Sequence, residues 1–434
     1  PESGTPFDEL LELLFERVVP CSFNTAAPGY LAYIPSGGLF HSAVADLIAD
    51  SVNRYVSVWL AAPGIAQLEI NVVRWLCEMV GYPRAAGGIL TSGGSLANFT
   101  AVATARQERL PENFLNGTLY VSEQVHHSIL KAATLAGFPA RNVRQVAVDR
   151  SFRMRLEDLE RQLDAGEREG KQPFMVVASA GTTNTGSVDD LVALADLAEQ
   201  RGLWLHTDAA YGGFFALTQR GREAMRGLER SDSITLDPHK GLFLPYGNGS
   251  LLVRDPETLH RTHSIQADYM PTMQADAERV DFCEISPELS RDFRGLRAWL
   301  PIKMHGIGVF RDSLDEKIDL ARWAADELMT IPEVQLIAEP QLSLVVFRLR
   351  PASAVEAELD SINQEFLDRI NRRQRVFLTG TSLRDLPGGG SFALRICVLS
   401  FRTHRSRMET CLADIRQAAQ ELSVEPAVLA ERAR

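Results

Sequence analysis

Short apolar runs alternate with amphipathic segments of helix length through the middle of the chain, from about residue 76 to 308. The runs have the length of strands, and the segments between several of them repeat apolar residues at helical spacing. The predicted strands are 118–122, 144–148, 174–179, 203–208, 233–236 and 249–253. This alternation predicts an α/β fold with a mainly parallel sheet covered by helices on both faces.

One helix of this region has both of its ends marked by the sequence. It is predicted at 188–201, where Ser187 and Asp190 have the spacing of a capping box and Gly202 follows the last residue. The polar, weakly periodic stretch 264–290 is expected to be a lid over a functional site. A surface excursion without a role is the alternative.

The pattern differs on either side of this region. Before it, helices are broken by Pro-Gly and Gly-Gly loops; after it, we expect a helix at 312–330, strands near 342–350 and 394–399, and helices near 354–373 and 406–422. The predicted organisation is therefore a helical N-terminal segment (1–75), a large α/β domain (76–308) and a small C-terminal α+β domain (309–434). A length of 434 residues agrees with more than one core.

Composition narrows the class of protein. The chain is 45% hydrophobic and 23% charged, as in globular proteins, and its net charge is −11. This balance disfavours a nucleic-acid or anionic-membrane partner, and no apolar run reaches the length of a membrane span. The start, Pro1-Glu2-Ser3-Gly4, does not read as a signal peptide.

The cysteines argue against a metal or disulfide framework. The five are scattered without a CxxC pair or a Cys/His cluster, so we expect no metal site and a cytoplasmic location. They are Cys21, Cys77, Cys283, Cys397 and Cys411.

An amine and a carboxylate each follow an apolar strand. Lys240 comes after 233–236 within Asp237-Pro238-His239-Lys240, and Asp208 ends 203–208. A lysine that holds pyridoxal phosphate (PLP) as a Schiff base and a carboxylate that pairs with the ring nitrogen fit this pattern. Taken singly, Lys240 could reach the surface and Asp208 could be a turn residue.

Three loops could complete such a site. The turn 91–98 places Gly94 and Ser95 before a helix, where backbone N–H groups bind phosphate. His126 follows the strand 118–122 and could stack on a flat cofactor, while Thr182 and Thr183 lie in a polar turn after 174–179. Each loop alone could be an ordinary cap or turn, but together they are far more specific.

Arg395 interrupts the apolar strand near 394–399. A buried arginine needs an anion, and a substrate carboxylate is one candidate. An internal salt bridge is the other.

Taken together, these motifs resemble the group II PLP-dependent amino-acid decarboxylases, the family of aromatic-L-amino-acid decarboxylase and glutamate decarboxylase. The similarity runs from about Tyr30 to Arg402, and 91–98, 122–128, 206–213 and 237–240 carry it most strongly. It implies an aspartate-aminotransferase-type fold (PLP fold type I), in which the large domain binds PLP, and a homodimer with sites at the interface.

The resemblance also implies roles for single residues. Lys240, His126 and Asp208 would be catalytic, and Ala210 would pack on the cofactor ring. Gly94, Ser95 and His239 would hold the phosphate, with Thr182, Thr183 and Asp237 also at the cofactor. The expected substrate-binding residues are Tyr33, Ile34, Pro35, Ser36, Trp59 and Arg395.

The predicted reaction is decarboxylation of an L-amino acid, favoured to be aromatic, to its amine and carbon dioxide. Family decarboxylases carry a protonating tyrosine on a mobile loop, where this chain offers Tyr269 and Phe282, the second nearer the expected position. Relatives with phenylalanine there resemble aldehyde synthases, which consume oxygen and release ammonia and hydrogen peroxide as well. Aldehyde synthesis is therefore one alternative, and a non-catalytic protein of the same fold is another.

Overall fold

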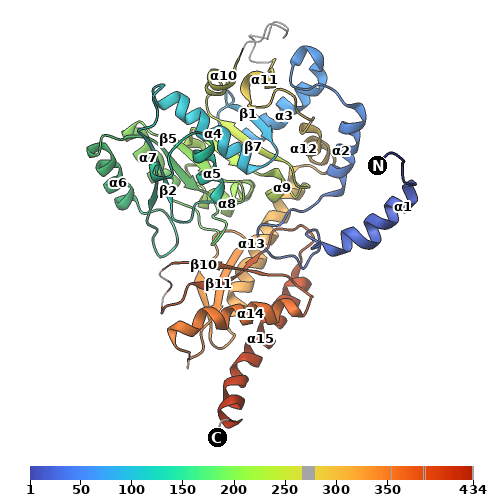
Figure 1. The fold of residues 1–434 in the computed structure, drawn as a ribbon, viewed down its shortest axis with the longest axis vertical. Coiled ribbons are helices and arrows are strands. Elements are labelled where there is room, and N and C mark those ends of the chain that lie inside the picture. Colours follow the sequence, from blue (N-terminus) through green and yellow to red (C-terminus); the bar gives the residue numbers. More distant parts are fainter. Residues whose placement is uncertain (266–278, 353, 385, 387, 433–434) are drawn as a thin grey trace.

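A computed structural model describes residues 1–265, 279–352, 354–384, 386 and 388–432 (Figure 1). Its larger sheet has the strand order β1-β7-β6-β5-β4-β2-β3. The strands are β1 (Gly87–Thr91), β2 (Gly117–Ser122), β3 (Val143–Val146), β4 (Gln172–Ser179), β5 (Trp204–Asp208), β6 (Ser233–Leu236) and β7 (Gly249–Val253). Neighbouring pairs from β3 to β6 are parallel, whereas β7 runs antiparallel to both β6 and β1.

The six predicted strands of this sheet are all present within two residues of their expected ends. Strand β1 was not predicted, because two glycines open it and glycine is depleted in strands. Gly88 is needed there: a Cβ atom at this position would lie 2.2 Å from the carbonyl oxygen of Leu251 on β7. A close backbone approach therefore hid the strand from the sequence pattern.

Helices cover both faces of the sheet, as predicted. Apolar residues of α4 (Gly94–Arg109) and α5 (His127–Leu135) pack on one face, and those of α3 (Pro63–Met79), α6 (Leu156–Arg168) and α7 (Leu191–Arg201) pack on the other. Alternate residues of β2 enter the two cores, with Leu119 in the first and Tyr120 in the second. The central strands are thus buried on both sides.

Helix α7 begins later than the predicted 188. Its N-cap is Asp190, whose side chain accepts the N–H of Ala193 at 3.1 Å, while Val188 forms a β-bridge with Ala180. The pairing of Val188 with the end of β4 draws this residue out of the helix. The predicted stop is correct, since Gly202 has a left-handed φ of 65°.

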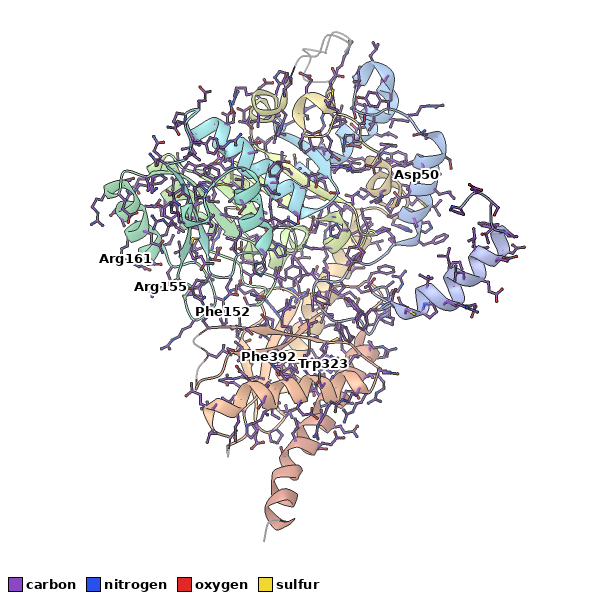
Figure 2. The ribbon with its side chains drawn as sticks, viewed as in Figure 1. Asp50, Phe152, Arg155, Arg161, Trp323 and Phe392 are labelled. Atoms are coloured by element: carbon purple, nitrogen blue, oxygen red, sulfur yellow. The ribbon has the colours of Figure 1, made fainter. Side chains whose placement is uncertain are left out.

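A second, antiparallel sheet lies in the C-terminal part, in the order β10-β11-β9-β8. Its strands are β8 (Val334–Ala338), β9 (Leu344–Leu349), β10 (Thr379–Ser382) and β11 (Phe392–Cys397), and α13 (Ile307–Met329), α14 (Leu359–Arg372) and α15 (Arg405–Arg432) accompany them. These elements share an apolar core of their own, against which Trp323 and Phe392 pack (Figure 2). Strands β8 and β10 were not predicted, because their half-exposed residues give no continuous apolar run.

The N-terminal segment is helical, and its first helix extends away from the body of the molecule (Figure 1). It comprises α1 (Phe7–Glu12), η1 (Leu13–Val18), η2 (Val19–Cys21), α2 (Phe40–Val52) and η3 (Trp59–Ala61). The first two helices contain no buried residue, and even their large apolar side chains are exposed, Phe7 by 72% and Phe15 by 63%.

The remaining short elements connect these layers. They are η4 (Ala140–Asn142), η5 (Gly213–Leu217), α8 (Gln219–Ala224), η6 (Leu228–Arg230), α9 (Pro238–Gly241), α10 (Glu257–His263), α11 (Phe282–Ile285), α12 (Gly295–His305) and η7 (Glu356–Glu358). Among the described residues, none of the helices is both long and apolar enough to cross a membrane. The described residues also contain no cluster of three or more His, Cys, Asp or Glu side chains that could hold a metal ion.

A buried ion pair links α3 to the segment that precedes α12. Glu69 Oε1 lies 2.5 Å from Arg291 Nη1, and both side chains are fully buried. The second oxygen of Glu69 accepts the N–H of Gly295 at 3.0 Å, and Arg291 donates to the carbonyl of Leu90 at 2.9 Å. The contact between Glu69 and Arg291 is an ion pair without the alignment of a hydrogen bond.

We expect Glu69→Gln to lower the free energy of unfolding by about 3–5 kcal/mol, because it leaves the Arg291 charge buried without its partner. Urea unfolding followed by circular dichroism measures this. Glu78→Gln, at an exposed position of the same helix, is the control and should change stability by less than about 0.5 kcal/mol. Equal stabilities of the two variants would show that the pair is dispensable.

Candidate active site

A cavity of about 290 Å³ opens beside the carboxyl ends of the parallel strands. Loops after β1, β2, β4, β5 and β6 all reach it, as expected for ligand sites in such sheets. Its lining residues are Ser92, Gly93, Gly94, Ser95, Leu96, Asn98, His126, Ser128, Ser179, Gly181, Thr182, Thr183, Asp208, Ala210, Tyr211, Asp237, His239 and Lys240. All ten residues predicted to contact a cofactor are among them.

Lys240 lies in α9, directly after β6, and its Nζ is 2.9 Å from Asp237 Oδ2. Burial acts to lower the pKa of Lys240, but the nearby Asp237 and Asp208 carboxylates outweigh it and raise this pKa above the usual value. The amine is therefore held as an ammonium ion by Asp237. The other oxygen of Asp237 is buried without a hydrogen-bond partner among the described residues.

Asp208 ends β5 and is 9% exposed. Its Oδ2 accepts from Asn98 Nδ2 at 3.0 Å and its Oδ1 accepts from the N–H of Ala210 at 3.1 Å. Both donors are neutral, while the ammonium of Lys240 pairs with the other carboxylate. A buried carboxylate without a cationic partner at contact distance in the described part of the chain suits a ligand carrying a protonated ring nitrogen.

His126 caps α5 and faces the same cavity. Its Nδ1 accepts the backbone N–H of Ser128 at 3.3 Å and lies 2.8 Å from the hydroxyl of Ser128. Burial lowers the pKa of His126, with Lys240 acting in the same direction and Asp208 opposing it. The imidazole is therefore neutral and held in place by its own helix.

The glycine turn between β1 and α4 can receive an anion. Gly93 has φ +156°, and Gly94 begins a helix of 16 residues whose first N–H groups point toward the cavity end. The His239 ring lies beside this turn, with its Cε1 3.6 Å from the position of a Cβ at Gly93. Its Nδ1 donates to the carbonyl of Asn248 at 2.5 Å. The helix N-terminus and the His239 ring together fit a phosphate group.

Arg395 does not line the cavity but contacts a residue that does. Its guanidinium donates to the carbonyls of Asn184 at 3.0 Å and Tyr33 at 3.3 Å, to Thr379 Oγ1 at 3.3 Å, and to the carbonyl of Thr183. No carboxylate is among its partners in the described ranges, so the alternative of an internal salt bridge is not realised there. Burial lowers the pKa of Arg395.

The other residues predicted for the substrate side also lie outside the cavity wall. Tyr33 is 58% exposed, Ile34 belongs to the core, and Ser36 donates to the carbonyl of Leu244 at 2.6 Å. Pro35 is buried within the same loop, and the backbone N–H of Trp59 donates to Asp281 at 2.6 Å. The structure thus brings the predicted cofactor residues together around the cavity, whereas the predicted substrate residues are not part of its lining.

Of the two residues considered for the protonating position, the structure describes Phe282 but not Tyr269. Phe282 is 1% exposed in α11, where it packs in an apolar core and under the guanidinium of Arg291, 4.8 Å from its ring centroid. Phe282 is not among the residues that line the cavity, and its place at the protonating position stays a prediction. Tyr269 lies outside the described residues, as does the middle of the predicted lid.

Sequence reasoning gave no role to several lining residues. The most important are Asn98 and Ser128, which contact Asp208 and His126 respectively. A signal existed for both: Asn98 is one helical turn after Gly94, and Ser128 follows His126 by two positions. Tyr211 is the third, held by Ser343 at 2.9 Å between the two sheets.

Comparisons with known proteins agree with this geometry. Residues 1–350 match the family model described as the pyridoxal-dependent decarboxylase conserved domain. The chain is 34% identical over 433 residues to an aromatic-L-amino-acid decarboxylase of Bacillus atrophaeus, which covers 99% of this chain and 89% of that protein.

Solved structures have the same fold. The structure of Oryza sativa TDC with PLP and tryptamine has a TM-score of 0.91 at 27% identity, over 97% of this chain and 89% of that one. The Rhodiola rosea 4-hydroxyphenylacetaldehyde synthase has a TM-score of 0.89 at 23% identity, over the same shares of the two chains, which shows the fold alone.

The chain therefore belongs to the pyridoxal-dependent decarboxylase family, and it is a PLP-dependent amino-acid decarboxylase with PLP fold type I. The predictions of family, fold class, cofactor and enzyme class are confirmed.

A fully buried histidine behind the cavity gives a pH-dependent stability. Burial lowers the pKa of His206 to about 4, against the opposing effect of Asp208. In the unfolded chain its pKa is about 6.5, so the unfolded state binds more protons between these values and stability falls as the pH decreases through this window.

We expect wild type to lose about 2 kcal/mol more unfolding free energy than His206→Gln when the pH is lowered from about 7 to about 5. Urea unfolding at both pH values measures the difference. His305→Gln, at an exposed position of α12, should keep the wild-type dependence. Parallel curves for wild type and His206→Gln would mean that folding does not lower the pKa of His206.

Proposed function

We propose that this chain decarboxylates an aromatic L-amino acid to the corresponding amine and carbon dioxide. The observation that carries the proposal is the meeting of Lys240, Asp208 and His126 around one cavity at the N-terminus of α4. The aromatic substrate is supported by the relative named as an aromatic-L-amino-acid decarboxylase and by the Oryza sativa TDC structure that contains tryptamine.

The residues of the cavity would hold PLP as follows. Lys240 would bind its aldehyde group, Gly94, Ser95 and His239 would bind its phosphate, and Asp208 would bind its ring nitrogen. Ala210 and His126 would lie against the ring, with Thr182, Thr183 and Asp237 at its edge. When bound, the cofactor supplies an electron sink for the electrons left behind as carbon dioxide departs.

The side chains of this protein would prepare that chemistry. Asp208 would keep a proton on the ring nitrogen, because its donors at contact distance among the described residues are neutral. Asp237 holds the ammonium of Lys240 at 2.9 Å and so controls when that amine loses its proton. The neutral His126 can move a proton at the reacting carbon.

The proposed substrate residues Tyr33, Ile34, Pro35, Ser36 and Trp59 would lie on the entrance side. Arg395 supports this, because it joins the carbonyl of Tyr33 to that of cavity residue Thr183. In this role Arg395 orients the loop that receives the substrate carboxylate, in addition to any direct contact with it.

Aldehyde synthesis is the alternative, and it rested on Phe282. Since this ring is buried away from the cavity, it gives no support to oxidative chemistry, and simple decarboxylation is preferred.

We also propose a homodimer in the cytoplasm. Exposed apolar residues in the first 23 positions, among them Phe7, Phe15 and Phe23, support a partner surface that covers them. Free cysteines throughout the described chain support a reducing compartment.

The proposal is tested by offering a panel of L-amino acids to the PLP-loaded enzyme and measuring amine, carbon dioxide, ammonia and peroxide. We expect amine and carbon dioxide in equal amounts from an aromatic substrate, without peroxide. Lys240→Ala should lose the reducible cofactor linkage: borohydride treatment and peptide mapping should find the pyridoxyl adduct at Lys240 in wild type only. An adduct at another lysine would refute the assignment.

We further expect Phe282→Tyr to leave the ratio of amine to aldehyde unchanged while lowering stability by about 1–3 kcal/mol, because it places a hydroxyl in an apolar core. Product analysis and urea unfolding of the purified variant test both parts. A variant with an altered product ratio would place this ring at the reacting centre after all.

A further inference from the structure

The amide of Asn98 in α4 uses its full hydrogen-bonding capacity. Its Nδ2 donates to Asp208 Oδ2 at 3.0 Å and to Ser128 Oγ at 2.8 Å, and its Oδ1 accepts from Thr235 Oγ1 at 2.7 Å. Nε2 of His206 lies 3.0 Å from the same Oδ1. Two donors and two acceptor sites are thus filled by four side chains from three elements, β5, β6 and α5.

Asp208 decides which way this amide faces. An ionised carboxylate only accepts hydrogen bonds, so the atom of Asn98 at 3.0 Å must be the nitrogen. The oxygen then faces His206, whose Nε2 must carry a hydrogen to donate to it. Since burial keeps His206 neutral, its Nδ1 accepts, and the hydroxyl of Ser233 at 2.8 Å donates to it.

The indole of Trp204 confirms the direction from the other end. It can only donate, and it donates to Ser233 Oγ at 2.8 Å, which leaves the hydroxyl hydrogen of Ser233 for His206. The hydrogen bonds therefore run one way, from Trp204 through Ser233 and His206 to Asn98.

The same logic fixes the hydrogen on His126. The hydroxyl of Ser128 accepts from Asn98, so its own hydrogen goes to His126 Nδ1 at 2.8 Å. The backbone N–H of Ser128 also donates to this Nδ1 at 3.3 Å. A neutral His126 with two donors on Nδ1 carries its hydrogen on Nε2.

We propose that Asn98 is a positioning residue that couples Asp208 to His126: it stabilises the carboxylate that binds the cofactor nitrogen and, through Ser128, fixes the hydrogen of His126 on Nε2. This inference rests on the proposed function. In this view the polar residues behind the cavity act together: they present the Asp208 carboxylate and an oriented His126 imidazole to the cofactor ring.

A double-mutant cycle tests whether Asn98 supports cofactor binding through Asp208. Apo forms of wild type, Asn98→Leu, Asp208→Asn and the double variant are titrated with pyridoxal phosphate, and dissociation constants are obtained from the visible absorbance. We expect Asn98→Leu to weaken binding about tenfold to a hundredfold in the wild-type background, because Asp208 loses a buried donor. In the Asp208→Asn background the same substitution should change binding by less than about threefold.

Two further variants separate positioning from packing. Asn98→Asp keeps the shape and the acceptor facing His206 but loses both donors, so it should bind the cofactor at least as weakly as Asn98→Leu. Thr104→Val, a buried position of α4 whose hydroxyl donates only to the helix carbonyl of Thr100, should bind like wild type. Far-UV circular dichroism confirms that each variant is folded.

The position of the hydrogen on the His126 ring is measured by nitrogen NMR of histidine-labelled protein. The His126 signal is assigned through its loss in His126→Gln. Wild type should show the Nε2–H form, and Asn98→Asp a mixture of the two forms. Additive effects in the cycle, wild-type binding by Asn98→Asp, or an unchanged His126 signal would overturn the inference and leave the proposed function intact. A wild-type protein that bound no pyridoxal phosphate would overturn both.

Discussion

The site depends on one buried carboxylate, that of Asp208 at the end of a central strand. Neutral N–H groups donate to both of its oxygens, while the Lys240 ammonium pairs with Asp237. The cavity thus presents a negative charge that a cationic ring nitrogen can balance.

The sheet supplies the rigidity that this arrangement needs. Asp208 pairs in register with Ser179 of β4 and with Thr235 of β6, so its backbone is fixed on both sides. Helix α4 crosses the same edge and delivers Gly94 to the anion end and Asn98 to the carboxylate, one turn apart. A single helix would therefore serve both ends of the proposed cofactor site, which a flexible loop could not do with comparable precision.

Two buried arginines tie distant parts of the chain to this sheet. Arg291 joins α3 and β1 to the segment before α12, and Arg395 joins the N-terminal loop and β10 to the turn that carries Thr183. Arg291 is paired with a carboxylate, whereas the partners of Arg395 in the described ranges are carbonyls and a hydroxyl. The planar guanidinium suits this task, because it donates in several directions at once.

The sequence alone determined the alternating architecture and the set of residues that line the cavity, because both depend on local patterns. Strands β2, β4 and β7 contain short apolar runs, and Lys240, Asp208 and His126 each lie at or just after the end of a predicted strand. Only the tertiary structure decided what depends on contacts between distant segments: that β1 exists despite Gly87 and Gly88, that Phe282 is a core residue, and that Arg395 binds carbonyls. The role of Asn98 belongs to the same group, since its four partners come from three separate elements that meet only in the folded chain.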